Sequence, residues 1–177
     1  MIKFFVIFIL IFSSQNISAQ KVIINGVEGN RLLQWSDFTG VPDYSSPYFA
    51  YTVWKTNFKY SAVRFSGETA LINGFEMTLI LDSTKSWLKK DKKSDDLLLH
   101  EQGHFDIGLL YMKDVLKEIS RAQFTRANYQ SEIRNLTARV HKKYNEMMLN
   151  YDSDTNHSKN KQQQNNWTKY FNDNLSR

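Results

Sequence analysis

The sequence predicts one α+β domain in which a small N-terminal, mainly antiparallel sheet precedes a group of packed helices. Two observations indicate this fold class. Strand-favouring residues and turns alternate from Lys21 to about Leu88, and beyond Leu88 the apolar residues recur at the spacing of a helix. With 177 residues, 41% of them hydrophobic and 14% aromatic, the chain can fill a single core.

Residues 1–19 have the pattern of a secretory signal peptide. Lys3 provides a positive charge, residues 4–12 form an unbroken apolar run of nine, and Ala19 is a small residue at the expected cleavage site. The run is shorter than the roughly 20 apolar residues that a membrane span needs. We therefore expect residues 20–177 to form a single exported domain, periplasmic or extracellular, with no stable membrane anchor after cleavage.

The composition narrows the classes of site and partner. The chain has no Cys, so any metal ligands are His, Asp or Glu rather than thiolates. The net charge of +5 is mildly basic, and the densest basic run, residues 89–93, is interrupted by Asp91. Nucleic-acid-binding proteins normally gather their positive charge into a patch or stripe. We therefore expect no nucleic-acid partner.

Turn residues and apolar alternation locate the predicted strands. Residues 22–24 end at the turn signal Asn25-Gly26, and residues 50–65 are rich in strand-favouring side chains. Apolar residues occupy every second position of residues 75–81, which predicts a half-buried strand over residues 75–82. Asn73-Gly74 separates it from residues 69–72 and predicts a hairpin. The strand over residues 75–82 could offer its edge to an extended peptide.

Three helices are predicted after Leu88. The first runs from about Asp95 to Ser120, with Ser94 as its cap, and is apolar around so much of its circumference that we expect it to be buried centrally. The second spans about Ser131 to Leu149, and residues 151–160 after it are polar and turn-rich. The aromatic residues after position 166 favour a last amphipathic helix over a flexible tail.

The first predicted helix contains His100-Glu101-Gln102-Gly103-His104, an H-E-x-x-H motif. Residues four apart share a helix face, so His100 and His104 can bind one ion. Glu101 lies beside them, where it can accept a proton from metal-bound water rather than ligate. Two histidines and a carboxylate are costly to bury unless they are satisfied, and Zn²⁺ satisfies them most simply. The motif therefore predicts a zincin-like zinc site.

Catalytic zinc normally takes three protein ligands plus water, so a third ligand is needed. The position six residues after His104, which would carry a His in metzincins, is Leu110. The remaining candidates on helices are Glu118, Glu132, Glu146 and His141. The stretch from Tyr151 to Ser158 is either a surface turn or a loop that brings His157, Asp152 or Asp154 to the zinc.

Several segments of the chain together form a wider pattern. They are Leu33-Gln34-Trp35-Ser36-Asp37-Phe38 with the Gly-x-Pro that follows, Ala50-Tyr51-Thr52, residues 100–106, residues 151–157 and residues 164–167. In these segments the chain resembles a family of predicted secreted bacterial zinc-dependent proteases, catalogued as domain of unknown function 922. The resemblance implies that the late Tyr-Asp-x-x-Thr-x-His stretch provides the third ligand, His157. One departure is Ser158, where a Gly would be familiar.

Together these features predict an exported zinc metallopeptidase that acts on a peptide or protein. Zinc held by His100, His104 and His157 would activate a water, and Glu101 would be the general base. A non-catalytic binding or envelope protein with a structural metal site is the alternative, and full ligation by three histidines and a carboxylate would favour it. Hydrolysis of a non-peptide amide is a third possibility. We expect Tyr151 to be a packing residue.

Overall fold

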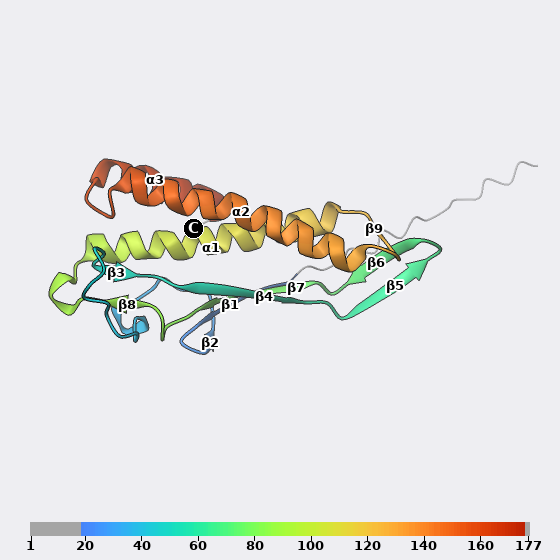
Figure 1. The fold of residues 1–177 in the computed structure, drawn as a ribbon, viewed down its shortest axis with the longest axis horizontal. Helices are drawn as coiled ribbons and strands as arrows, with labels where there is room; N and C mark the ends of the chain where they lie inside the picture. The colour runs from blue at the N-terminus through green and yellow to red at the C-terminus, as the bar shows by residue number, and fades with distance from the viewer. Residues whose placement is uncertain (1–18, 176–177) are drawn as a thin grey trace, which may run out of the picture.

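Three helices cover one face of a four-stranded sheet in the computed structural model, which describes residues 19–175 (Figure 1). The strand order is β2-β1-β7-β4, with bounds β1 Ala19–Ile24, β2 Val27–Glu28, β4 Trp54–Lys59 and β7 Glu76–Leu81. β7 is parallel to β1 and antiparallel to β4, and β2 is antiparallel to β1. The predicted α+β class is confirmed. The predicted signal segment lies outside the described residues, apart from Ala19 at the start of β1.

β7 lies in the middle of the sheet and buries one apolar face. Phe75, Met77, Leu79 and Leu81 are at most 3% exposed, whereas the residues between them are partly exposed. This confirms the predicted half-buried strand. Both edges of β7 are hydrogen-bonded to neighbouring strands, so the prediction that it offers an edge to an extended peptide is wrong.

The predicted hairpin across Asn73-Gly74 is also wrong. β6 (Thr69–Asn73) pairs with β5 (Ala62–Ser66) and β9 (Phe124–Thr125) in a separate sheet. Gly74 turns the chain with a φ of 60°, and β7 then enters the central sheet. Asn73-Gly74 marks a bend as predicted, but the strands on either side of it belong to different sheets. The remaining short elements are β3 (Ala50–Tyr51) paired with β8 (Trp87–Leu88), η1 (Trp35–Asp37) and η2 (Lys90–Lys92).

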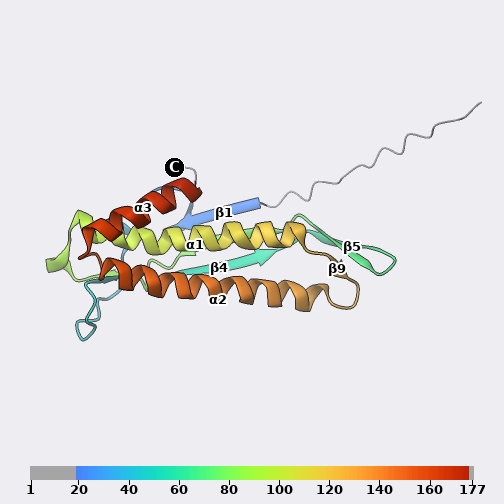
Figure 2. The same cartoon turned by 90° about the horizontal axis from the view of Figure 1, so that it is seen from above.

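Helix α1 (Asp95–Arg121) is the central helix, as its apolar circumference predicted. Its N-terminus is capped by the Ser94 hydroxyl, which accepts a hydrogen bond from the Leu97 N–H. Most of its side chains are buried, because the sheet lies on one side and two helices lie on the other (Figures 1 and 2). Polar residues on such a helix are consequently held out of water.

Helix α2 (Tyr129–Thr155) continues past the predicted end at Leu149. Tyr151 and Thr155, one turn apart, are fully buried, and the Thr155 hydroxyl donates to the Tyr151 carbonyl. Packing therefore keeps the polar segment helical. Helix α3 (Lys161–Leu175) confirms the predicted last helix, and its Phe171 is buried. Within residues 19–175, no helix is long and apolar enough to cross a membrane.

Candidate metal centre

Helix α1 brings three polar side chains of the H-E-x-x-H motif together. His100 and Glu101 are 2% and 3% exposed, and His104 is one turn further along. The ring centroids of His100 and His104 lie 4.9 Å apart. The helical spacing predicted from the sequence therefore holds, and both histidines line the same cavity as Glu101.

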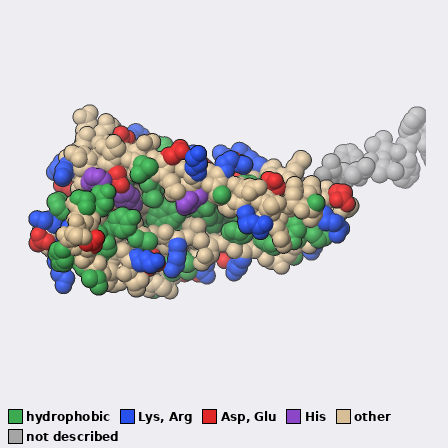
Figure 3. All heavy atoms as spheres, viewed as in Figure 1, with side chains coloured by type: hydrophobic (Ala, Val, Ile, Leu, Met, Phe, Trp, Pro, Cys, Tyr) green, Lys and Arg blue, Asp and Glu red, His purple; other side chains and the backbone are tan. Residues whose placement is uncertain are grey.

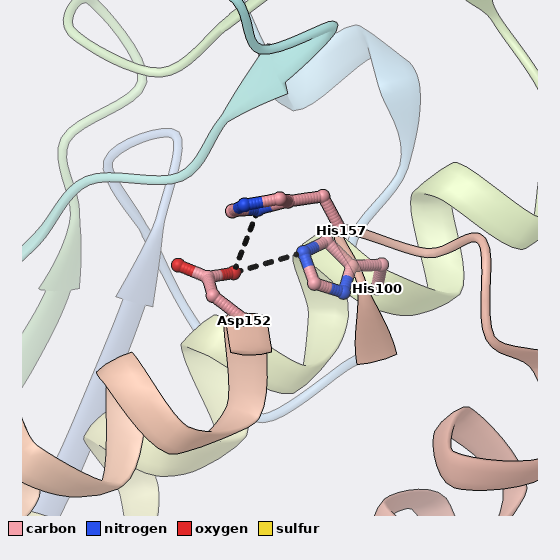
Figure 4. A group of neighbouring side chains, drawn as sticks. All are labelled: His100, Asp152 and His157. Carbon is pink, nitrogen blue, oxygen red and sulfur yellow. Dashed lines mark ion pairs between the residues drawn. The ribbon is translucent and has the colours of Figure 1, made fainter. Parts of the chain in front are cut away.

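Helix α2 and the turn after it bring Asp152 and His157 to His100 (Figure 4). Asp152 Oδ1 lies 3.2 Å from His100 Nε2, 3.0 Å from His104 Nε2 and 3.5 Å from His157 Nδ1. One ligand atom each from His100, Asp152 and His157 can be chosen so that all three lie within 4.8 Å of one another. Thus one carboxylate oxygen contacts all three histidines that the sequence analysis singled out.

The Asp152 side chain is 29% exposed, but one of its carboxylate oxygens has an unusual environment. Its Oδ1 is buried and makes no hydrogen bond, although three ring nitrogens surround it. A buried oxygen without a hydrogen bond is costly unless another group satisfies it.

The donor set fits a zinc ion. Zinc binds imidazole nitrogen and carboxylate oxygen at about 2.0–2.2 Å in a tetrahedron, so its ligand atoms lie about 3.3 Å from one another. The distances from Asp152 Oδ1 to the three ring nitrogens, 3.0 to 3.5 Å, are near that value. Among the described residues, His100, Asp152 and His157 therefore form the group that could hold the metal, and His104 lies beside it, with Nε2 3.0 Å from Asp152 Oδ1.

A buried hydrogen-bond network orients His100. The Oε1 atom of Gln164, on α3, lies 3.3 Å from His100 Nδ1, and Thr155 Oγ1 lies 3.4 Å from it. The Tyr151 hydroxyl donates to the His100 carbonyl at 2.9 Å, and the Tyr151 ring stacks on the imidazole with centroids 4.8 Å apart. When Nδ1 carries the proton and donates to Gln164, Nε2 is left with a lone pair for a metal.

Gly103 is the motif position that this packing requires to be small. A Cβ atom there would lie 2.1 Å from the Tyr151 hydroxyl oxygen and 2.4 Å from Cζ. The Tyr151 side chain is fully buried, at 0% exposed. Burial raises the pKa of Tyr151, so the hydroxyl remains protonated. The expectation that Tyr151 is a packing residue agrees with this burial, and its hydroxyl has the added contact to His100.

Glu101 is oriented by a hydrogen bond from the segment between β3 and β4. The Thr52 hydroxyl, between β3 and β4, donates to Glu101 Oε2 at 2.5 Å. The indole N–H of Trp54 donates to the His104 carbonyl at 3.0 Å and ties the same turn of α1 to β4. Glu101 is therefore held at the cavity wall beside the histidines.

A cavity of about 610 Å³ opens beside this cluster. Its walls are segment 47–52, the first turns of α1, the end of α2, and residues 157 and 159. In the space-filling view, histidine side chains reach the surface among hydrophobic ones on this face (Figure 3). A cavity of this size is in the usual range for binding sites of small ligands.

The other candidate ligands lie elsewhere or have other contacts. Asp154 accepts a hydrogen bond from the Trp167 indole, and the His141 ring packs edge-on against Tyr111. Among the described residues, the glutamates Glu118, Glu132 and Glu146 belong to no candidate metal group. Sequence reasoning kept Asp152 as an alternative to His157, whereas the structure brings both to the site.

Gln164 was missed as a site residue. It lies in a polar run, and only its burial on α3, where it is 4% exposed, reveals its contact with His100. Its place in residues 164–167, a segment of the wider sequence pattern, was the one signal that pointed to it.

Comparison with known protein families gives one match. A family described as "Bacterial protein of unknown function (DUF922)" matches residues 24–158, which include the whole H-E-x-x-H motif, Asp152 and His157. Neither a curated protein nor a solved structure matches the chain.

Proposed function

The chain belongs to this bacterial family of unknown function, and we propose that it is an exported zinc-dependent peptide hydrolase. The observation that carries the proposal is the buried Asp152 Oδ1, which has no hydrogen bond and lies 3.0–3.5 Å from nitrogens of three histidines. Glu101 lines the same cavity. This combination supports a metal site with a neighbouring base, in the pattern of the zincins.

The proposed reaction assigns separate tasks to the residues of the site. Zinc held by these residues would supply a Lewis acid that lowers the pKa of a bound water to about 7 and polarises the substrate carbonyl. Glu101 accepts a proton as the water oxygen bonds to the peptide carbonyl carbon, then delivers a proton to the amine as the C–N bond breaks. Thr52 keeps the Glu101 carboxylate in position through its hydrogen bond to Oε2.

The position of Asp152 also favours a second candidate function. Three histidines and Asp152 together would fill a tetrahedral zinc shell, and closed shells are typical of structural zinc sites. In that case the chain would be a non-catalytic exported binding or envelope protein. In the hydrolase, Asp152 would instead give up its position to water or substrate, or zinc would take a fifth ligand.

Zinc content and peptide hydrolysis, measured on the same variants, distinguish the two functions. We expect one equivalent of zinc in residues 20–177 and in Glu101→Gln, with hydrolysis of a peptide library by the unsubstituted chain alone. His157→Ala should lose most of the zinc. If zinc binds but nothing is hydrolysed, and Asp152→Ala loses the metal, the structural site is correct. Absence of zinc after reconstitution would refute both.

A further inference from the structure

The cavity beside the metal centre has one wall made by a single face of α2. Asn145, Met148, Leu149 and Asp152 line it, and their spacing of three and four residues places them on one side of the helix. Asp152 therefore lies on the same helix face as the apolar side chains of Met148 and Leu149. Leu149 is 70% exposed, although it borders a cavity.

The opposite wall is aromatic. Tyr48, Phe49 and Tyr51 line the cavity and are 40%, 39% and 50% exposed. Tyr48 also packs against His157, with ring centroids 5.0 Å apart, so the aromatic wall reaches the candidate metal ligands directly. Contiguous apolar side chains that remain exposed around a hollow are typical of a binding surface.

The charges at the cavity leave few partners for a cationic side chain. Its two carboxylates already face other groups: Glu101 accepts a hydrogen bond from Thr52, and Asp152 Oδ1 faces the ring nitrogens of three histidines. Lys159 is the only Lys or Arg among the described residues that line the cavity. A lysine or arginine of a ligand would therefore lose water without gaining a free carboxylate.

We propose that this cavity binds a large apolar side chain of a peptide, next to the bond that is cleaved, so that the substrates are peptides with residues such as Phe or Leu at that position. The inference rests on the proposed hydrolase function. The volume of about 610 Å³ accommodates such a side chain with flanking backbone. Leu149 and the aromatic wall formed by Tyr48, Phe49 and Tyr51 determine the specificity.

Binding, measured separately from cleavage, tests the inference. The probes are acetyl-Ala-Ala-X-Ala-Ala-amide peptides with X as Phe, Leu, Ala or Lys, titrated by NMR into zinc-reconstituted Glu101→Gln. We expect the Phe and Leu peptides to bind about 10-fold or more tightly than the Ala peptide, and the Lys peptide to bind no better than Ala. Leu149→Gln in the same background should reduce this preference by about threefold or more.

Leu32→Gln is the matched control, since Leu32 is 61% exposed and does not line the cavity. It should leave the preference unchanged. Equal binding of all four peptides, or a preference that Leu149→Gln leaves intact, would overturn the inference. If the preference is found but the unsubstituted chain hydrolyses none of the peptides, the pocket is correct and the hydrolase function is wrong. If all four peptides are hydrolysed at equal rates, the hydrolase function is correct and the proposed preference of the pocket is wrong.

Discussion

Substitution of Gln164 should weaken zinc binding although Gln164 is not a ligand. Its side chain lies 3.3 Å from His100 Nδ1 and donates to the Tyr151 hydroxyl at 2.8 Å. In Gln164→Ala, the Nδ1 atom keeps only Thr155 Oγ1 at 3.4 Å. The imidazole is then less restricted to the tautomer and orientation that leave Nε2 free for a metal.

The expected size follows from these lost contacts. Loss of the hydrogen-bond partner of a ligating His typically weakens metal binding by about 10- to 100-fold, which corresponds to about 1.4–2.7 kcal/mol. Gln164 is 4% exposed, so its removal also leaves the Tyr151 hydroxyl with one fewer partner in a buried place. We expect a further loss of about 1–3 kcal/mol in the free energy of unfolding of the metal-free protein.

Competition with a chromophoric chelator measures the zinc affinity, and urea unfolding measures the stability of the same preparation. Gln162→Ala is the control, because Gln162 belongs to the same run on α3 but is exposed. Nitrogen-15 NMR of the His100 ring reports the tautomer directly. The reasoning is refuted if Gln164→Ala loses stability as expected yet binds zinc within twofold of the unsubstituted chain, since Gln164 would then be a packing residue alone.

Three other substitutions test separate parts of the structure. Gly103→Ala should lower the free energy of unfolding by about 1–3 kcal/mol in urea, because its Cβ would lie 2.1 Å from the Tyr151 hydroxyl oxygen; an unchanged midpoint would contradict this packing. Burial opposes ionisation of Asp37, but its bonds to Arg31 hold its pKa below the usual range, so the carboxylate stabilises the fold at neutral pH. That contribution should be lost as the pH falls below about 4, through the lowered pKa of the folded state, and Asp37→Asn should flatten the decline in urea midpoint between about pH 5 and pH 2. Ser158→Gly should raise the melting temperature, with a gain of about 0.5–1 kcal/mol, because Ser158 has a φ of 73°; a lower melting temperature would show that the serine side chain stabilises the turn.

Patterns within single elements predicted much of the fold. The Ser94 cap and the apolar circumference identified α1, and the alternation after Gly74 identified β7. Each of these signals depends only on neighbours along the chain. Prediction of the paired strand failed for the same reason: Asn73-Gly74 bends the chain, but nothing near it in sequence indicates that β7 pairs with β1, 57 residues earlier.

The site was predictable to a similar extent. His100, Glu101 and His104 share one helix, so their spacing was sufficient to group them. Asp152 and His157 reach them from α2 and the following turn, and their contacts depend on how α2 packs along α1. The polar composition of residues 151–155 suggested a loop, whereas the buried side chains of Tyr151 and Thr155 keep this segment helical.

The end of α2 explains how Asp152 and His157 can face the same point. Asn156, His157 and Ser158 have φ values of 46°, 49° and 73°, three successive residues in the left-handed region that favours glycine. This conformation reverses the chain direction, and the His157 N–H donates to the Asp152 carbonyl at 3.1 Å. Side chains that a continuing helix would direct to different sides therefore converge. Because left-handed residues other than glycine are strained and persist only where their surroundings enforce them, the position of this turn beside the Asp152 carboxylate supports a role in holding the site.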